Sequence, residues 1–183
     1  MVLRKPLLAI SKIGNLLNIL NLNIIVMKPN IGISEKHLSD SAQLLSVILA
    51  DEMTLYIKTR KCHWNVAGES FMELHKLFQS QYTELEETID LVAERINKLG
   101  VKTIGTMKEF LDLTRIIESP DKYPSQKDMI KELLHDHESL IVALRKDIVI
   151  SDEQNKDAGT MDFITGIMEQ HETTAWVLRR YLS

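Results

Sequence analysis

The sequence predicts an all-α protein: a bundle of four long helices with an additional short helix in the connection between the second and third long helices. Long stretches are built from Leu, Ile, Glu, Lys, Met and Gln, which favour helix over sheet. Only seven glycines and four prolines interrupt the 183 residues. Apolar residues recur at steps of three and four, the period of an amphipathic helix. Each long segment would extend about 40 Å at 1.5 Å per residue, a length typical of four-helix bundles.

The first two long helices flank a predicted turn at residues 65–68. The first follows Ser34, and its apolar stripe runs toward His63. The second carries the most regular stripe in the chain and ends at Gly100, because glycine readily adopts the backbone conformation that closes a helix. The stripes consist of Leu38, Ala42, Leu45, Leu49, Met53 and Tyr56 in the first helix, and of Phe71, Leu74, Phe78, Tyr82, Leu85, Ile89, Val92, Ile96 and Leu99 in the second.

Three further helices are predicted in the second half of the chain. Thr106 and Glu109 have the spacing of a capping box, so a short helix begins there and ends before Pro120. Ser125 is a suitable N-cap for the third long helix. The polar segment SDEQNKDAGT, residues 151–160, is expected to be a loop before the last helix. The two apolar stripes are Ile130, Leu133, His137, Leu140, Leu144 and Ile148, and then Ile164, Ile167, His171, Thr174, Leu178 and Leu182.

Length and composition fit one domain with a sizeable core, here residues 34–183, preceded by a flexible leader, residues 1–33. Residues 1–26 have a basic start and an apolar run, but Lys12 and four asparagines interrupt it and no small-residue cleavage site follows. Residues 1–26 have three possible interpretations: upstream sequence read from an early start codon, a basic tail, or a weak membrane-surface anchor. Cys62 is the only cysteine, which excludes an intrachain disulfide and favours a cytoplasmic protein.

The formal net charge of −4 is unevenly distributed along the chain. Arg4, Lys5, Lys12 and Lys28 all precede Glu35, the first acidic residue. Without those four positive charges, the rest of the chain has a net charge of about −8. Such a body attracts cations and repels nucleic acid unless a local basic patch overrides it.

Two histidines and two carboxylates have the chemistry of a metal site. Asp90 and Glu94 lie one turn apart on the same flank of the second long helix, a spacing that can hold a divalent cation. His75 lies near that flank but fifteen residues earlier, about 22 Å along the axis. One chain therefore cannot bring His75 and Asp90 to one ion. If two copies pack these helices antiparallel about a twofold axis, His75 of one copy meets Asp90 of the other, and His63 joins His75 across the turn.

Such a site would offer two nitrogen ligands and two carboxylates. This mixture suits Fe(II) or another first-row metal better than calcium or a closed zinc site. The structural alternative is that the histidines are hydrogen-bonded core or surface residues and that the carboxylates form a solvated helix face. Spacing alone leaves both interpretations open.

The run HWNVAGESFMELHKLFQSQYTELEETIDLVAERINKLG, residues 63–100, resembles the Dps family, the ferritin-like mini-ferritins that protect bacterial DNA during starvation and oxidative stress. The similarity includes His-Trp-Asn-Val, the Gly and Phe after it, the Leu-His pair and Asp-x-x-Ala-Glu-Arg. HETTAWVLRRYL, near the C-terminus, extends it over residues 30–183. The resemblance implies a ferritin-like bundle in a dodecameric shell. Its ferroxidase centres would lie at twofold interfaces, oxidise Fe(II) preferentially with hydrogen peroxide and store the ferric product.

The resemblance also implies roles for particular residues. His63 and His75 match the family's two histidine ligands, and Asp90 and Glu94 match the carboxylates that come from the partner subunit. These four are the expected catalytic and iron-binding residues. Trp64 matches the tryptophan beside the centre, where it would intercept oxidising equivalents.

One ligand position departs from the family pattern. Gln79 stands where the family usually carries Asp or often Glu. An amide oxygen can coordinate a metal but brings no negative charge, so the second iron position is expected to be held less well. Asp157 and Asp162 resemble the acidic residues that line the threefold pores of these shells, with solvated surface as the alternative. Glu84, Glu86 and Glu87 would help to nucleate mineral, or form an ordinary charged helix face.

The other residues that could bind a metal or react are expected to have structural roles. Glu132 and His135 form a Glu-x-x-His pair like that of di-iron bundles, but the second such pair is absent. His137 and His171 are expected to fill the bundle interior. Cys62 is expected to be inert, and Trp176 is expected to pack.

Two alternatives to the ferroxidase function remain. The first is a DNA-condensing scaffold with weak or no ferroxidase activity, whose basic leader would contact phosphates from many copies at once. The second is an assembly that binds metal but does not oxidise iron because of Gln79. No membrane partner is expected.

Overall fold

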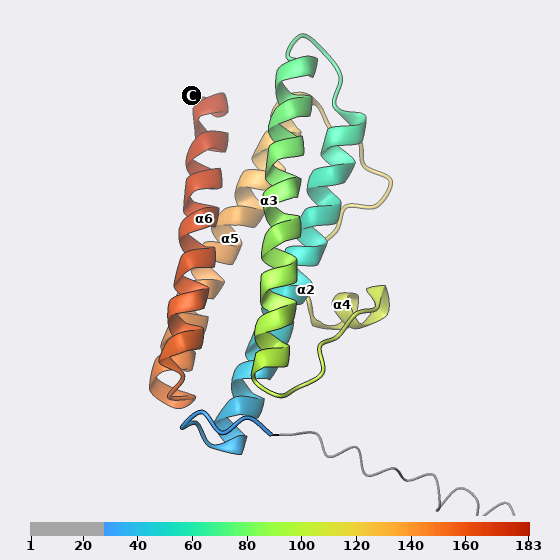
Figure 1. The fold of residues 1–183 in the computed structure, drawn as a ribbon. Coiled ribbons are helices and arrows are strands. Elements are labelled where there is room, and N and C mark those ends of the chain that lie inside the picture. Colours follow the sequence, from blue (N-terminus) through green and yellow to red (C-terminus); the bar gives the residue numbers. More distant parts are fainter. Residues whose placement is uncertain (1–27) are drawn as a thin grey trace, which may run out of the picture.

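A computed structural model describes residues 28–183, and these residues contain helices and no strand (Figure 1). The predicted all-α bundle with a short helix between the second and third long helices is confirmed. The leader interpretations concern residues 1–27, which lie outside the described part. The elements are α2 (Glu35–Asn65), α3 (Phe71–Lys98), α4 (Met107–Leu113), α5 (Gln126–Val149), the π-helical turn η1 (Ile150–Gln154) and α6 (Ala158–Leu182).

The long helices pack as two hairpins, α2 with α3 and α5 with α6 (Figure 1). A short turn, residues 66–70, joins α2 to α3, whereas the connection from α3 to α5 spans residues 99–125 and carries α4. In Figure 1 this connection runs from one end of the bundle to the other, so α5 has the same direction as α3. Four-helix bundles with one long crossover have this arrangement. None of the described helices combines the length and the apolar character needed to cross a bilayer.

The caps predicted at Thr106, Ser125 and Gly100 are present, and Ser34 caps α2 as well. Ser34 and Ser125 each accept a hydrogen bond from the backbone amide three residues further on. Thr106 and Glu109 form a complete capping box at the start of α4. Gly100 follows α3 with a φ of +81°, in the left-handed region where glycine is favoured. These local signals fix the helix ends and so the length of each connection.

The segment between α5 and α6 differs from the predicted loop. Ile150–Gln154 continue α5 as a π-helical turn, and α6 begins at Ala158. The Ser151 hydroxyl donates to the Asp157 carbonyl at 3.2 Å, and the Asp157 amide donates to the Ser151 carbonyl at 3.0 Å. Both residues are buried. The loop prediction was wrong because these polar side chains satisfy backbone groups inside the fold rather than water.

The core consists of two apolar clusters separated by a buried polar layer. One cluster surrounds the first half of α2, and the other surrounds its second half. The layer lies between them and contains Asp51 and Glu52 of α2, His137 and Asp147 of α5, and His171 of α6. The clusters include Leu45, Leu49, Val92, Ile96, Leu144 and Ile164 on one side and Leu55, Phe78, Leu85, Leu133, Leu140 and Leu178 on the other.

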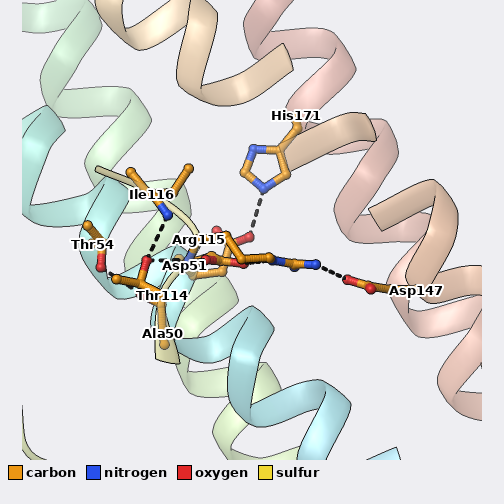
Figure 2. Close-up of polar contacts among 9 residues, drawn as sticks. Ala50, Asp51, Thr54, Thr114, Arg115, Ile116, Asp147 and His171 are labelled. Carbon is orange, nitrogen blue, oxygen red and sulfur yellow. Dashed lines mark hydrogen bonds and ion pairs between the residues drawn. The ribbon is translucent and has the colours of Figure 1, made fainter. Parts of the chain in front are cut away.

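Arg115, in the connection after α4, joins two carboxylates of this layer. Figure 2 shows its side chain between Asp51 and Asp147. Its Nε donates to Asp51 at 2.7 Å, and its terminal nitrogen donates to Asp147 at 2.9 Å. Burial raises the pKa of both carboxyl groups, while the Arg115 guanidinium acts in the opposite direction. Arg115 therefore anchors the crossover to α2 and α5 and compensates two buried charges.

Replacing Arg115 by Met is expected to lower the free energy of unfolding by about 2–3 kcal/mol at pH 7, because two buried carboxylates lose their partner. This range allows for the 33% exposure of the Arg115 side chain. Without the guanidinium, the folded-state pKa values of Asp51 and Asp147 rise further above their unfolded values. Stability from such groups is present at low pH and lost as the pH rises above the unfolded carboxyl value of 3.8, so the deficit should grow as the pH is raised from there toward neutrality.

Urea denaturation measures both effects, with Lys108→Met as the matched control. Lys108 pairs with Asp112 on the exposed surface of α4 at 2.8 Å, so its loss should leave the free energy of unfolding almost unchanged. Equal losses in the two variants would contradict the anchoring role of Arg115.

Candidate metal centre

His63 and His75 face each other across the turn that joins α2 to α3. His63 lies in the last turn of α2 and His75 in the second turn of α3. Their rings stack with centroids 3.8 Å apart and an interplanar angle of 18°. The Nδ1 of His63 lies 2.8 Å from the carbonyl oxygen of His75, and the Nδ1 of His75 lies 2.9 Å from the carbonyl oxygen of His63. The two residues therefore hold each other through a reciprocal pair of hydrogen bonds.

These hydrogen bonds fix the tautomer of both imidazoles. A carbonyl oxygen only accepts, so each Nδ1 must carry the hydrogen and donate it. In the neutral ring the Nε2 atom then bears the lone pair. A backbone carbonyl on Nδ1 is the usual arrangement by which proteins orient a metal-binding histidine. The pair is thus prepared to offer two nitrogen ligands.

Aromatic rings restrain the histidine pair from the sides. Tyr82 of α3 meets His63 edge-on, with centroids 5.2 Å apart at 80°. Phe71, at the start of α3, lies 5.1 Å from His75. His63 is buried and His75 half-buried, so the rings have little freedom to rotate away from this geometry.

The predicted carboxylates lie elsewhere on α3. Asp90 and Glu94 are exposed, and Glu94 pairs with Lys98 at 3.0 Å. Because α3 is continuous from Phe71 to Lys98, the axial separation of His75 and Asp90 stays about 22 Å. Within residues 28–183, no three His, Cys, Asp or Glu side chains are grouped to hold a metal ion. One protomer therefore brings together the two histidines of the predicted site, and the completion of that site by a second copy stays a prediction.

The neighbouring site residues are at the surface of the protomer. Gln79 is exposed one turn after His75, and Trp64 is 62% exposed beside His63. The acidic residues of the predicted mineral-nucleating face, Glu84, Glu86 and Glu87, are exposed as well. Their roles stay predictions.

The two predicted pore residues have different environments. Asp157 is 1% exposed, caps α6 by accepting from the Thr160 amide at 2.9 Å, and pairs with Arg95 at 3.2 Å. A side chain enclosed in this way cannot line a pore, so the pore assignment of Asp157 was wrong. Asp157 is enclosed because its side chain caps the first turn of α6. Asp162 is exposed, and its pore role stays a prediction.

The Glu-x-x-His pair on α5 does not converge on a site. Glu132 accepts from Ser119 at 2.8 Å and pairs with Lys58 at 3.1 Å, whereas His135 is exposed.

Cys62 is buried, and burial raises the pKa of its thiol to about 12, so the thiol stays protonated at neutral pH. Trp176 was expected to pack, but it is 55% exposed, so that prediction was wrong for this chain by itself.

His137 and His171 occupy the bundle interior, as predicted. Their Nδ1 atoms lie 2.8 Å apart, and the Nε2 of His171 lies 2.8 Å from Glu52 (the contact from His171 is also drawn in Figure 2). Burial, and secondarily the proximity of His171, lowers the pKa of His137 well below 6.5. The sequence analysis did not single out Glu52, because its position within the α2 sequence resembles any helical carboxylate.

A second group missed by the sequence analysis surrounds the histidine pair. Arg60 lies over the rings of Tyr56, Trp64 and Tyr82. Three of these residues recur every four positions on α2, a spacing that places them on one face. The spacing of the α2 residues could have been recognised in the sequence. Only the structure shows that Tyr82 of α3 joins the same group.

Comparisons with known proteins agree with this architecture. The sequence pattern of the ferritin-like domain family matches residues 42–183. A low-temperature-induced protein of Nostoc sp. is 42% identical over 84% of this chain and 86% of its own length. DNA protection during starvation protein 2 of Bacillus anthracis is 35% identical over 77% of this chain and 95% of its own length.

A solved structure extends the comparison to three dimensions. The Dps protein of Vibrio cholerae, described as a member of a broad superfamily of ferritin-like diiron-carboxylate proteins, superimposes with a TM-score of 0.79. It is 28% identical, and the match covers 85% of this chain and 97% of that one. The bundle with its long crossover places the chain among ferritin-like proteins. Within that class, it belongs to the Dps family of mini-ferritins.

The pH dependence of stability should report the buried His137. Its pKa is lowered in the folded state, so its stabilising contribution is complete above the unfolded value of about 6.5 and is lost as the pH falls below it. Each pH unit of this loss corresponds to about 1.4 kcal/mol. His137→Leu should therefore show a flatter dependence than the wild type between about pH 6.5 and pH 5.5.

Urea denaturation at a series of pH values tests this. His135→Leu is the control, because that histidine is exposed on the same helix and should leave the slope unchanged. A slope that is the same in all three proteins would show that His137 does not resist protonation in the fold.

Proposed function

We propose that this protein is a ferroxidase and iron-storage protein of the Dps type, oxidising Fe(II) preferentially with hydrogen peroxide. Its centres would form at twofold interfaces of a homo-oligomer, for which the family resemblance implies a dodecamer. The reciprocally bonded histidine pair carries the proposal, because it presents two oriented nitrogen ligands with no carboxylate of residues 28–183 of the same protomer within reach. Asp90 and Glu94, exposed near the other end of α3, are available to a second copy.

Each part of the chain has a defined task in this reaction. His63 and His75 supply neutral nitrogen donors, and Asp90 and Glu94 of the second copy supply the negative charge that favours binding of Fe(II) and Fe(III). Two Fe(II) ions give one electron each to hydrogen peroxide, which takes up two protons and becomes two water molecules. The protein holds metal and oxidant in a fixed geometry rather than donating or accepting the protons itself. Removal of both reagents would protect DNA from hydroxyl radicals.

The names of similar proteins support the proposed function. The Bacillus anthracis relative is named for DNA protection during starvation, and the Vibrio cholerae structure is assigned to diiron-carboxylate proteins. The alternative is a DNA-condensing scaffold, which the basic residues of the leader would favour. A protein that retards plasmid DNA but does not accelerate Fe(II) oxidation would establish that alternative.

Mixing two inactive variants tests the shared site. The double variant His63→Ala/His75→Ala should oxidise Fe(II) with peroxide no faster than buffer, and so should Asp90→Asn/Glu94→Gln. When the two are unfolded, mixed in equal amounts and reassembled, each mixed pair regains one intact site. Random pairing should then restore about a quarter of the wild-type rate of ferric absorbance increase.

Each variant reassembled alone is the control for the mixing experiment. If the mixture stays inactive while its assembly state matches the wild type, the histidines and carboxylates do not share an interface. If the histidine variant alone keeps the wild-type rate, the ferroxidase assignment itself fails.

Gln79→Asp tests the departure from the family pattern. Restoring a carboxylate beside His75 should tighten the weaker Fe(II) equivalent at least about fivefold, the effect of one added charge close to the ion. Anaerobic Fe(II) titration measures the two equivalents separately. Gln43→Asp, at an exposed glutamine of α2, is the control for added charge away from the site. An unchanged second equivalent in Gln79→Asp would show that residue 79 is not a ligand position.

A further inference from the structure

Arg60 lies in a cage of three aromatic rings next to the histidine pair. The carbon of its guanidinium lies 4.6 Å from the ring centroid of Tyr82, 5.3 Å from that of Tyr56 and 5.4 Å from that of Trp64. One of its terminal nitrogens donates to the Tyr56 hydroxyl, and its Nε has no hydrogen-bond partner among the described residues. The rings therefore provide much of what holds this side chain in place.

The cage adjoins the histidine pair, to which the proposed function brings Fe(II) and an oxidant. Tyr82 contacts His63 edge-on at 5.2 Å, and Trp64 follows His63 in the chain. Tyrosine and tryptophan are the side chains of this group that readily lose an electron. A reaction that brings Fe(II) and peroxide to His63 would place both rings at risk.

We propose that Arg60 makes one-electron oxidation of Trp64 and Tyr82 less favourable, so that the oxidant takes electrons first from Fe(II) and Trp64 intercepts oxidising equivalents only when Fe(II) is lacking. The effect of Arg60 on the oxidation of the two rings does not depend on iron. Its consequence for iron chemistry rests on the proposed function.

The physical basis is a reversal of sign on oxidation. A guanidinium is attracted to the electron-rich face of a neutral ring. When the ring gives up an electron it becomes a radical cation, and two positive charges then lie about 5 Å apart until the indole or phenol proton is lost to water. The Arg60 charge is permanent, because its pKa lies far above neutral pH. Arg60 thus stabilises the reduced ring and opposes the first step of its oxidation.

Trp176 provides an internal reference. It is 55% exposed, close to the 62% of Trp64, and among residues 28–183 no cation lies over its ring. In a single protomer, exposure alone therefore gives Trp64 no protection relative to Trp176. The ratio of oxidation at the two tryptophans isolates the effect of Arg60, because conditions and oxidant dose cancel when variants are compared.

Chlorine dioxide is a suitable probe because it is a neutral one-electron oxidant. It takes one electron from the ring and becomes chlorite, and the ring proton goes to water. The full-length protein would be treated without iron, and mass spectrometry of peptides would give the ratio of oxidised Trp64 to oxidised Trp176. Arg60→Gln and Arg60→Met remove the charge, while Arg60→Lys keeps it.

The expected ratio rises about threefold to tenfold in Arg60→Gln and Arg60→Met, which corresponds to a water-like screening of the repulsion. In Arg60→Lys it should stay within about twofold of the wild type. Circular dichroism and the thermal midpoint verify folding, and Met preserves the packing of the side chain if Gln does not. An unchanged ratio in the neutral variants overturns the proposal. An equal rise in the lysine variant also overturns it, because contact rather than charge would then be the cause.

A second arm uses Fe(II) and hydrogen peroxide. Oxidation of Trp64 per iron oxidised should increase in Arg60→Gln relative to the wild type, and an unchanged value removes the link to iron chemistry. If neither protein accelerates iron oxidation while the chlorine dioxide ratio changes as expected, the proposed function fails and the protective role of Arg60 stands.

Discussion

Two adjacent carboxylates in the middle of α2, Asp51 and Glu52, constrain the arrangement of the whole bundle. Both are fully buried, and a buried carboxylate is costly unless it is paired. Arg115 reaches Asp51 from the crossover, and His171 reaches Glu52 from α6. The crossover and the second hairpin are therefore both positioned against one turn of α2. The apolar clusters on either side supply most of the burial energy, but apolar contacts tolerate sliding, whereas these polar pairs define a single register.

The same polar layer disfavours metal binding at His171 in the bundle interior. Both nitrogens of His171 are already used, one by Glu52 and one by His137. A metal ion bound to His171 would have to displace one of these buried hydrogen bonds, which is costly. At the end of the α2–α3 hairpin the situation differs, because His63 and His75 satisfy their Nδ1 atoms with each other's carbonyls and keep Nε2 available. Hydrogen bonding thus distinguishes His171, whose two ring nitrogens are both engaged, from His63 and His75.

The sequence predicted what depends on local spacing and missed what depends on rotation between helices. The stripes, the caps at Thr106 and Ser125 and the end of α3 follow from neighbours along the chain, and all are present. The pairing of His63 with His75 was accessible because a short turn leaves little choice of geometry. The burial of Asp157 was not, since a polar run has the same composition whether its side chains meet water or backbone amides. The Arg60 cage likewise needs the position of α3 relative to α2, which no periodicity specifies.

Under the proposed function, the charges around the histidine pair make metal binding depend on assembly. The two imidazoles bind as neutral ligands, and Arg60 places a permanent positive charge on the neighbouring rings. The histidine half-site of one protomer therefore contains no negative ligand to offset a divalent cation. That charge must come from Asp90 and Glu94 of a second copy, because the rigid α3 keeps both of the protomer's own carboxylates at least about 22 Å from His75. An isolated protomer would hold Fe(II) weakly, and only the closed interface would combine tight binding with rings that resist oxidation.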